Sequence, residues 1–85
     1  MASYSLRVSR SAERELRGIP KPDLERILKR IRALADDPRP HGCVRLSGAP
    51  GYRVRQGDWR VIYEVDDLVR AVKIIKVGHR REVYR

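Results

Sequence analysis

The chain has 85 residues, of which 41% are hydrophobic and 36% charged, so we expect one folded domain over residues 1–85 and not a disordered segment. Its 20 Lys and Arg against 11 Asp and Glu give a net charge of +9, divided as +4 before residue 41 and +5 after it, which favours a nucleic acid or an acidic protein as partner. The sequence has no apolar run near the roughly 18 residues of a membrane span and no apolar segment typical of a signal peptide, so we expect no membrane association. Its one cysteine has no partner for a disulfide, which together with these absences predicts a cytoplasmic location.

The first half of the chain predicts one strand and two helices. Residues 4–9 alternate apolar and polar side chains, as a half-buried strand does. Ser9 or Ser11 then caps a short helix that should end near Gly18. Pro22 suits the first position of a second helix, which ends before the prolines of residues 36–40. This second helix has one apolar stripe, formed by Leu24, Ile27, Leu28, Ile31, Leu34 and Ala35.

The second half changes to the two-residue period of strands. Residues 43–46 predict a short strand and residues 47–51 a turn. Residues 52–56 and 59–65 predict a hairpin, because Gly57 and Asp58 between them suit a type II′ turn. Residues 69–77 predict a final strand whose nearly continuous apolar character favours an inner position in the sheet, and residues 78–85 are expected to leave the sheet.

This order predicts an α+β fold with two layers. Two helices that follow each other can cover only one face of a sheet. We therefore expect the N-terminal strand and the helical hairpin to pack on one face of a mainly antiparallel sheet of about four to five strands. The other face stays open to a ligand.

The predicted hairpin divides its side chains between these two faces. Alternation places Tyr52, Val54, Val61 and Tyr63 toward the helices and Arg53, Arg55 and Arg60 on the open face. Three guanidinium groups on one face repel one another unless an anion lies among them, and each has a planar set of donors suited to phosphate oxygens. The pattern by itself predicts a surface that binds a polyanion.

Three segments of the chain are similar to those of a known protein family. They are "YRVR" at residues 52–55, "WRVIYEV" at residues 59–65 and "VGHRREVY" at residues 77–84. With the order of elements, they resemble the RelE branch of the RelE/ParE superfamily, the toxins of bacterial and archaeal toxin–antitoxin pairs. The resemblance implies a ribosome-dependent endoribonuclease that cuts mRNA in the ribosomal A site. It also implies a small antitoxin that wraps the toxin, contacts with 16S rRNA, and a free toxin that is monomeric.

The same resemblance assigns the site by position. It implies catalytic roles for Arg53, Arg55, Arg60, Arg80 and Tyr84. The arginines would stabilise the phosphorane and the leaving group, and Tyr84 would stack on a base or take part in proton transfer. Several family members have lysines at the positions of Arg53 and Arg55. Because arginine stays protonated whereas lysine can lose its proton, the identity of the general base stays open.

The remaining candidate residues have plainer interpretations. His79 is expected to have a structural or substrate-positioning role in preference to a catalytic one, and His41 to be a surface residue. Trp59 and Tyr63 are interpreted as core or rim side chains rather than platforms for base stacking, and Cys43 as a small hydrophobic residue. The histidines lack carboxylates or thiols at ligand spacing, so we expect no metal and no cofactor.

Two other functions remain open at this point. The ParE-type branch of the superfamily shares the fold but inhibits DNA gyrase without cutting RNA, and the terminal "RREVY" argues against it. The other alternative is an RNA-binding relic of the toxin fold that has no catalytic activity.

Overall fold

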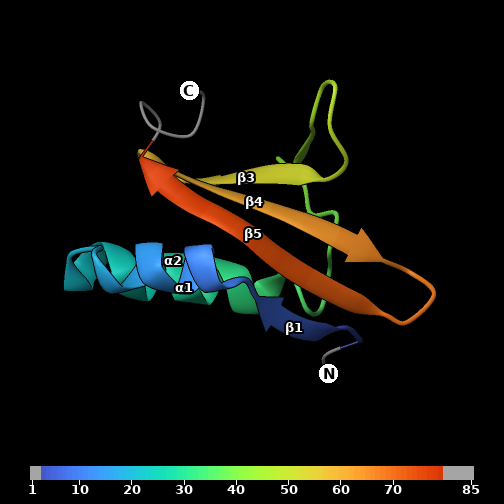
Figure 1. The fold of residues 1–85 in the computed structure, drawn as a ribbon, viewed down its shortest axis with the longest axis horizontal. Coiled ribbons are helices and arrows are strands. Elements are labelled where there is room, and N and C mark those ends of the chain that lie inside the picture. Colours follow the sequence, from blue (N-terminus) through green and yellow to red (C-terminus); the bar gives the residue numbers. More distant parts are fainter. Residues whose placement is uncertain (1–2, 80–85) are drawn as a thin grey trace.

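The protein forms two layers, with both helices on one side of a five-stranded sheet (Figure 1). The computed structural model describes residues 3–79. Along this part of the chain the elements are β1 (Ser5–Val8), α1 (Arg10–Arg17), α2 (Lys21–Ala33), β2 (Val44–Arg45), β3 (Tyr52–Gln56), β4 (Trp59–Asp66) and β5 (Ala71–His79). This is the predicted α+β architecture. Neither helix within residues 3–79 has the length and apolar character that crossing a bilayer requires.

The sheet has the strand order β1-β5-β4-β3-β2. Strand β1 runs parallel to β5, and the other neighbouring strands are antiparallel. Strand β5 therefore lies inside the sheet, as its apolar composition predicts. The β3–β4 connection has Gly57 at φ 60°, the left-handed conformation that the first position of a type II′ turn requires.

The helix starts are fixed by the residues just before them. Ser9 is the N-cap of α1, because its side-chain oxygen accepts a hydrogen bond from the backbone N–H of Ala12 at 3.1 Å. Helix α2 begins at Lys21, so Pro22 is its second residue and the prediction that Pro22 comes first is wrong by one position. Proline fits there as well, since the first N–H groups of a helix have no partner within the helix.

The core lies between the helices and one face of the sheet. It contains the predicted apolar stripe of α2 except Leu28, which is half-buried outside it, together with the predicted inward residues of the hairpin. Its fully buried members include Ile27, Leu34, Val54, Val61, Tyr63, Val72 and Ile74. The Tyr63 hydroxyl donates a hydrogen bond of 2.7 Å to the carbonyl of Pro38, in the loop that follows α2. This bond satisfies a polar group that burial would otherwise make costly.

Strand β5 is longer at its C-terminal end than the sequence predicts. Gly78 and His79 belong to it, so the prediction that the chain leaves the sheet at residue 78 is wrong for these two residues. They pair with Arg60 and Trp59 of β4, which extends the ladder to the end of the hairpin. Because cross-strand hydrogen bonds hold the backbone whatever its side chains are, local composition does not show this extension.

Helix α1 covers the outer edge of β5 where β1 has ended. The Glu15 carboxylate accepts a hydrogen bond from the backbone N–H of Val77 at 3.0 Å and another from the Lys76 ammonium at 2.9 Å. The carboxylate thus takes the place of a neighbouring strand. An edge N–H that would otherwise remain open to pairing with another chain is satisfied.

A polar cluster fastens the loop after α2 to the β4–β5 turn. Arg39 donates to both carboxylate oxygens of Asp67, at 3.3 and 2.8 Å, and to the Tyr52 hydroxyl at 2.9 Å. The Tyr4 hydroxyl donates to the same carboxylate at 2.7 Å. These hydrogen bonds hold the pKa of Asp67 below its usual range, with the bond from Arg39 as the largest cause and the bond from Tyr4 next.

Candidate nucleic-acid interface

The predicted arginines of the hairpin share one face of the sheet. In the register of β3 and β4, Arg55 lies opposite Arg60 and Arg53 lies opposite Ile62. Cross-strand partners point to the same side of a sheet, and Val54 and Val61, which alternate with them, are buried on the side of the helices. The three guanidinium side chains therefore project from the face that the helices leave open, as predicted.

The three side chains differ in depth. Arg55 is exposed and Arg53 is half-buried, whereas Arg60 is only 7% exposed. The prediction that all three lie on the open face is confirmed, and the burial of Arg60 on that face is a feature the sequence does not predict. Periodicity assigns a residue to a face of a sheet but says nothing of what covers it. A buried guanidinium is held in a defined position, and its charge acts in surroundings with less water to screen it.

Further basic residues extend this face across the sheet. Lys73 and Arg7 lie opposite each other on β5 and β1, whereas Lys76, opposite Ile62 of β4, is ion-paired with Glu15 of α1. Glu64 contributes an acid opposite Lys73. The described strands thus place more positive than negative charge on the open side, which attracts a polyanion along the sheet.

Two of the predicted catalytic residues, Arg80 and Tyr84, lie outside the described residues. Their roles remain predictions. His79 lies at the last position of β5, directly opposite Trp59, with which it forms an edge-to-face ring contact at 5.7 Å between centroids. Within residues 3–79 there is no group of three His, Cys, Asp or Glu side chains that could hold a metal ion.

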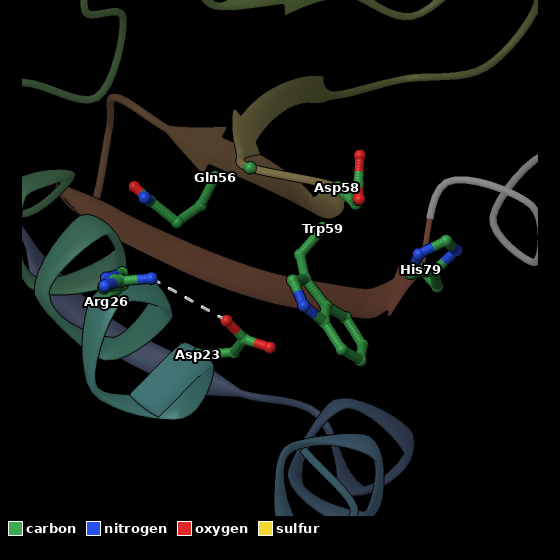
Figure 2. A pocket seen from close by; sticks show the side chains of 7 residues that line it. Asp23, Arg26, Gln56, Asp58, Trp59 and His79 are labelled. Atoms are coloured by element: carbon green, nitrogen blue, oxygen red, sulfur yellow. Dashed lines mark ion pairs between the residues drawn. The ribbon is translucent and has the colours of Figure 1, made fainter. Parts of the chain in front are cut away.

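The structure also shows a cavity that sequence reasoning missed. It has a volume of about 320 Å³ and lies where the tip of the β3–β4 hairpin meets the start of α2 (Figure 2). Gln56, Trp59 and His79 line it from three neighbouring strands, and Asp23 and Arg26 line it from the helix. Trp59 is half-buried and packs against the core, as its interpretation as a rim residue predicts. Only the register of the three strands reveals that these side chains meet.

Tyr63 takes no part in proton transfer on the open face. Its ring is fully buried on the helix side of the sheet, and its hydroxyl donates to Pro38. Burial, and next the nearby Cys43, raises the pKa of this phenol well above its usual value. Tyr63 is therefore a neutral core residue, as predicted.

The chain is similar to known toxins over nearly its whole length. Residues 6–84 match the model of a family described as the ParE toxin of the type II toxin–antitoxin system, parDE. Toxin RelG of Mycobacterium tuberculosis is 30% identical over 84 residues, which cover 96% of this chain and 97% of the relative.

Solved structures show the same fold. The RelBE2 toxin–antitoxin complex of Mycobacterium tuberculosis contains a chain with a TM-score of 0.82 and 27% identity, covering 92% of this chain and 99% of that one. The archaeal RelE–RelB complex of Pyrococcus horikoshii contains a chain with a TM-score of 0.81 and 29% identity, covering 95% of this chain and 99% of that one. The isolated RelE toxin of E. coli has a TM-score of 0.79 and 29% identity, covering 95% of this chain and 90% of the E. coli chain.

Proposed function

Because the chain belongs to the RelE/ParE superfamily and is a type II toxin, we propose that it is a metal-independent endoribonuclease that cuts mRNA in the ribosomal A site and so inhibits translation. The observation that carries this proposal is the shared face of Arg53, Arg55 and Arg60. Its similarity to RelE toxins over at least nine-tenths of the chain supports the choice of RNA as the polyanion.

The proposed reaction is an internal transesterification. The ribose 2′-oxygen attacks the adjacent phosphorus, the bond from phosphorus to the 5′-oxygen breaks, and the products are a cyclic phosphate and a 5′-hydroxyl. Negative charge builds up on the phosphorane oxygens as the bond forms. Cationic donors that are fixed before the reaction stabilise this charge more in the transition state than in the ground state. Arg55 and the buried Arg60, paired across the hairpin, suit this role.

The proton transfers belong to other groups. Arginine stays protonated at neutral pH, so none of the hairpin arginines serves as the base that takes the 2′-OH proton. We assign Arg80 to the leaving 5′-oxygen and Tyr84 to base stacking or proton transfer, as the resemblance implies. The base itself is not identified among the described residues.

The proposed partners follow from the same surface. The relatives from M. tuberculosis and P. horikoshii were solved as toxin–antitoxin complexes, and this chain has a net charge of +9. We propose that a small acidic antitoxin covers the basic face and blocks RNA access, since complementary charge speeds such an encounter. The free toxin is proposed to be monomeric and to contact 16S rRNA when it reaches its mRNA substrate.

Programmed ribosomes test the activity directly. The purified chain is incubated with ribosomes that carry an mRNA in an open A site, and the RNA is mapped by primer extension. We expect a cut within the A-site codon. A matched mRNA with a 2′-deoxyribose at the cut position should stay intact, because it lacks the attacking hydroxyl. If both RNAs are cut, or neither, the proposed reaction is wrong.

One observation favours a second candidate. The matching family model is described as that of the ParE toxin, and the resemblance to the superfamily implies that its ParE branch inhibits DNA gyrase. A gyrase supercoiling assay separates the two functions, since a ParE-type toxin would stop supercoiling and leave mRNA on the ribosome intact. Salt-dependent RNA binding without any product and without gyrase inhibition would instead identify a non-catalytic RNA-binding relic.

A further inference from the structure

Two adjacent rows of residues cross the sheet at its hairpin end and carry different chemistry. The row of Arg55, Arg60 and Gly78 lies on the open face. The next row, formed by Gln56, Trp59 and His79, points to the opposite side. Neighbouring residues in a strand are about 3.3 Å apart, so the charged row and the aromatic row are separated by a single residue step.

The second row lines the cavity of about 320 Å³ at the hairpin tip. The rings of Trp59 and His79 meet at an interplanar angle of 85°, so they form a corner. A planar aromatic ligand fits such a corner, with its face on one ring and its edge against the other. Both residues are half-buried and line the cavity.

The polar side of this cavity combines the carboxylates of Asp23 and Asp58, which accept hydrogen bonds, with the guanidinium of Arg26, which donates them. The Asp23 carboxylate can only accept hydrogen bonds, and Figure 2 shows it directed toward the indole of Trp59. Its ion pair with Arg26 is 3.9 Å long, too long for a hydrogen bond, and the Asp23 side chain is 41% exposed. The Gln56 amide, on the sheet side, both donates and accepts. An aromatic ring whose edge carries an N–H₂ group beside an acceptor atom matches this set of acceptors and donors.

We propose that the cavity binds a nucleobase with an exocyclic amino group, in an RNA strand that passes around the hairpin tip from the arginines on the open face. The inference rests on the proposed function, since it takes the ligand to be RNA. Cytosine, adenine and guanine carry such an amino group, and uracil does not. Trp59 and His79 supply stacking that every base accepts, and Asp23 supplies the preference against uracil. The site therefore positions the RNA and selects its sequence without touching the reacting atoms.

Tryptophan fluorescence reports on this site alone, because Trp59 is the only tryptophan in the chain. The purified protein is titrated with hexacytidylate and with hexauridylate, which carry equal charge, and emission is recorded beside the anisotropy of end-labelled RNA. We expect quenching of Trp59 by both RNAs and several-fold tighter binding of hexacytidylate. Asp23→Asn should remove this difference. Glu25→Gln, with the same loss of charge at an exposed position of α2 outside the cavity, should keep it.

Two results would overturn the proposal. One is Trp59 emission that does not change while anisotropy shows RNA bound. The other is equal affinity for the two hexamers in the wild-type protein. Neither result depends on ribosomes or on cleavage, so a failure here is distinct from a failure of the endoribonuclease activity.

Discussion

Arg55 and Arg60 lie directly opposite each other on the antiparallel strands β3 and β4. Like charges in such a pair destabilise a sheet, by an amount on the order of several tenths of a kcal/mol. A phosphate group bound between them would attract both cations and so oppose this repulsion. Under the proposed function, the pair favours RNA binding at some expense of stability.

Arg55→Gln separates these two effects. We expect the free energy of unfolding to rise by about 0.5 kcal/mol, since one of the two like charges is removed. We also expect RNA affinity to fall and its dependence on salt to weaken by about one phosphate contact. Urea denaturation and anisotropy titrations at several salt concentrations measure both. Arg14→Gln, at an exposed site on α1, is the control and should leave both quantities nearly unchanged. A less stable Arg55→Gln protein would contradict the repulsion.

Gly51 is required by its backbone contacts. Its φ is +112°, and a Cβ atom there would lie 2.6 Å from the carbonyl oxygen of Tyr63. Gly51→Ala should therefore destabilise the fold by about 3 kcal/mol or more, from strain together with the clash. Gly48→Ala is the control, because Gly48 has φ +75° but nothing within 4 Å of its Cβ position. Its cost should be about 1 kcal/mol. Equal midpoints of denaturation for the two variants would refute the clash.

Asp67 makes the stability of the fold depend on pH. Its pKa is lowered in the folded state, chiefly by the hydrogen bond from Arg39. The ionised carboxylate thus stabilises the fold in full above the unfolded-state pKa of about 3.9, and this contribution is lost as the pH falls through the lower folded-state pKa. Asp67→Asn should lower the Tm by a few degrees at pH 7 and by less at pH 3. A Tm difference that stays constant from pH 7 to pH 2 would exclude this role for Asp67.

The Tyr63 hydroxyl anchors the loop that follows α2. Tyr63→Phe leaves the Pro38 carbonyl without its donor in a buried place, which should cost about 1–2 kcal/mol. Tyr52→Phe removes a hydroxyl that accepts from the exposed Arg39, and water replaces that bond, so its cost should be smaller. Chemical denaturation of both variants tests the order. The reverse order would show that the Pro38 bond has no net effect.

Strong local patterns made most of the fold predictable. The apolar stripe of α2, the β3–β4 hairpin and the inward position of Val54 and Tyr63 follow from periodicity and turn chemistry, which act within a few residues. The end of β5 could not be predicted in this way. Gly78 and His79 are not typical strand residues, and they are in the strand because β4 offers backbone partners that lie far away in the sequence.

The sequence predicted which face of the sheet carries the site residues, but it did not predict how deeply each of them is buried. Alternation placed the three hairpin arginines on one side, whereas the burial of Arg60 depends on which groups cover it. The corner of Trp59 and His79 depends on the register of β4 against β5, which no local pattern specifies. Asp23 joins it from a helix more than 30 positions earlier in the sequence than Trp59. Side chains that meet only through tertiary structure are therefore the ones that the sequence analysis missed.

The rate of A-site mRNA cleavage by Arg55→Ala, compared with wild type and with Arg14→Ala, tests the central claim most directly. If the hairpin arginines stabilise the phosphorane, wild type and Arg14→Ala cleave at similar rates. The single-turnover rate of Arg55→Ala should then fall on the order of a hundredfold at saturating ribosomes. Cleavage by Arg55→Ala at the wild-type rate would contradict the claim, and so would intact mRNA with all three proteins.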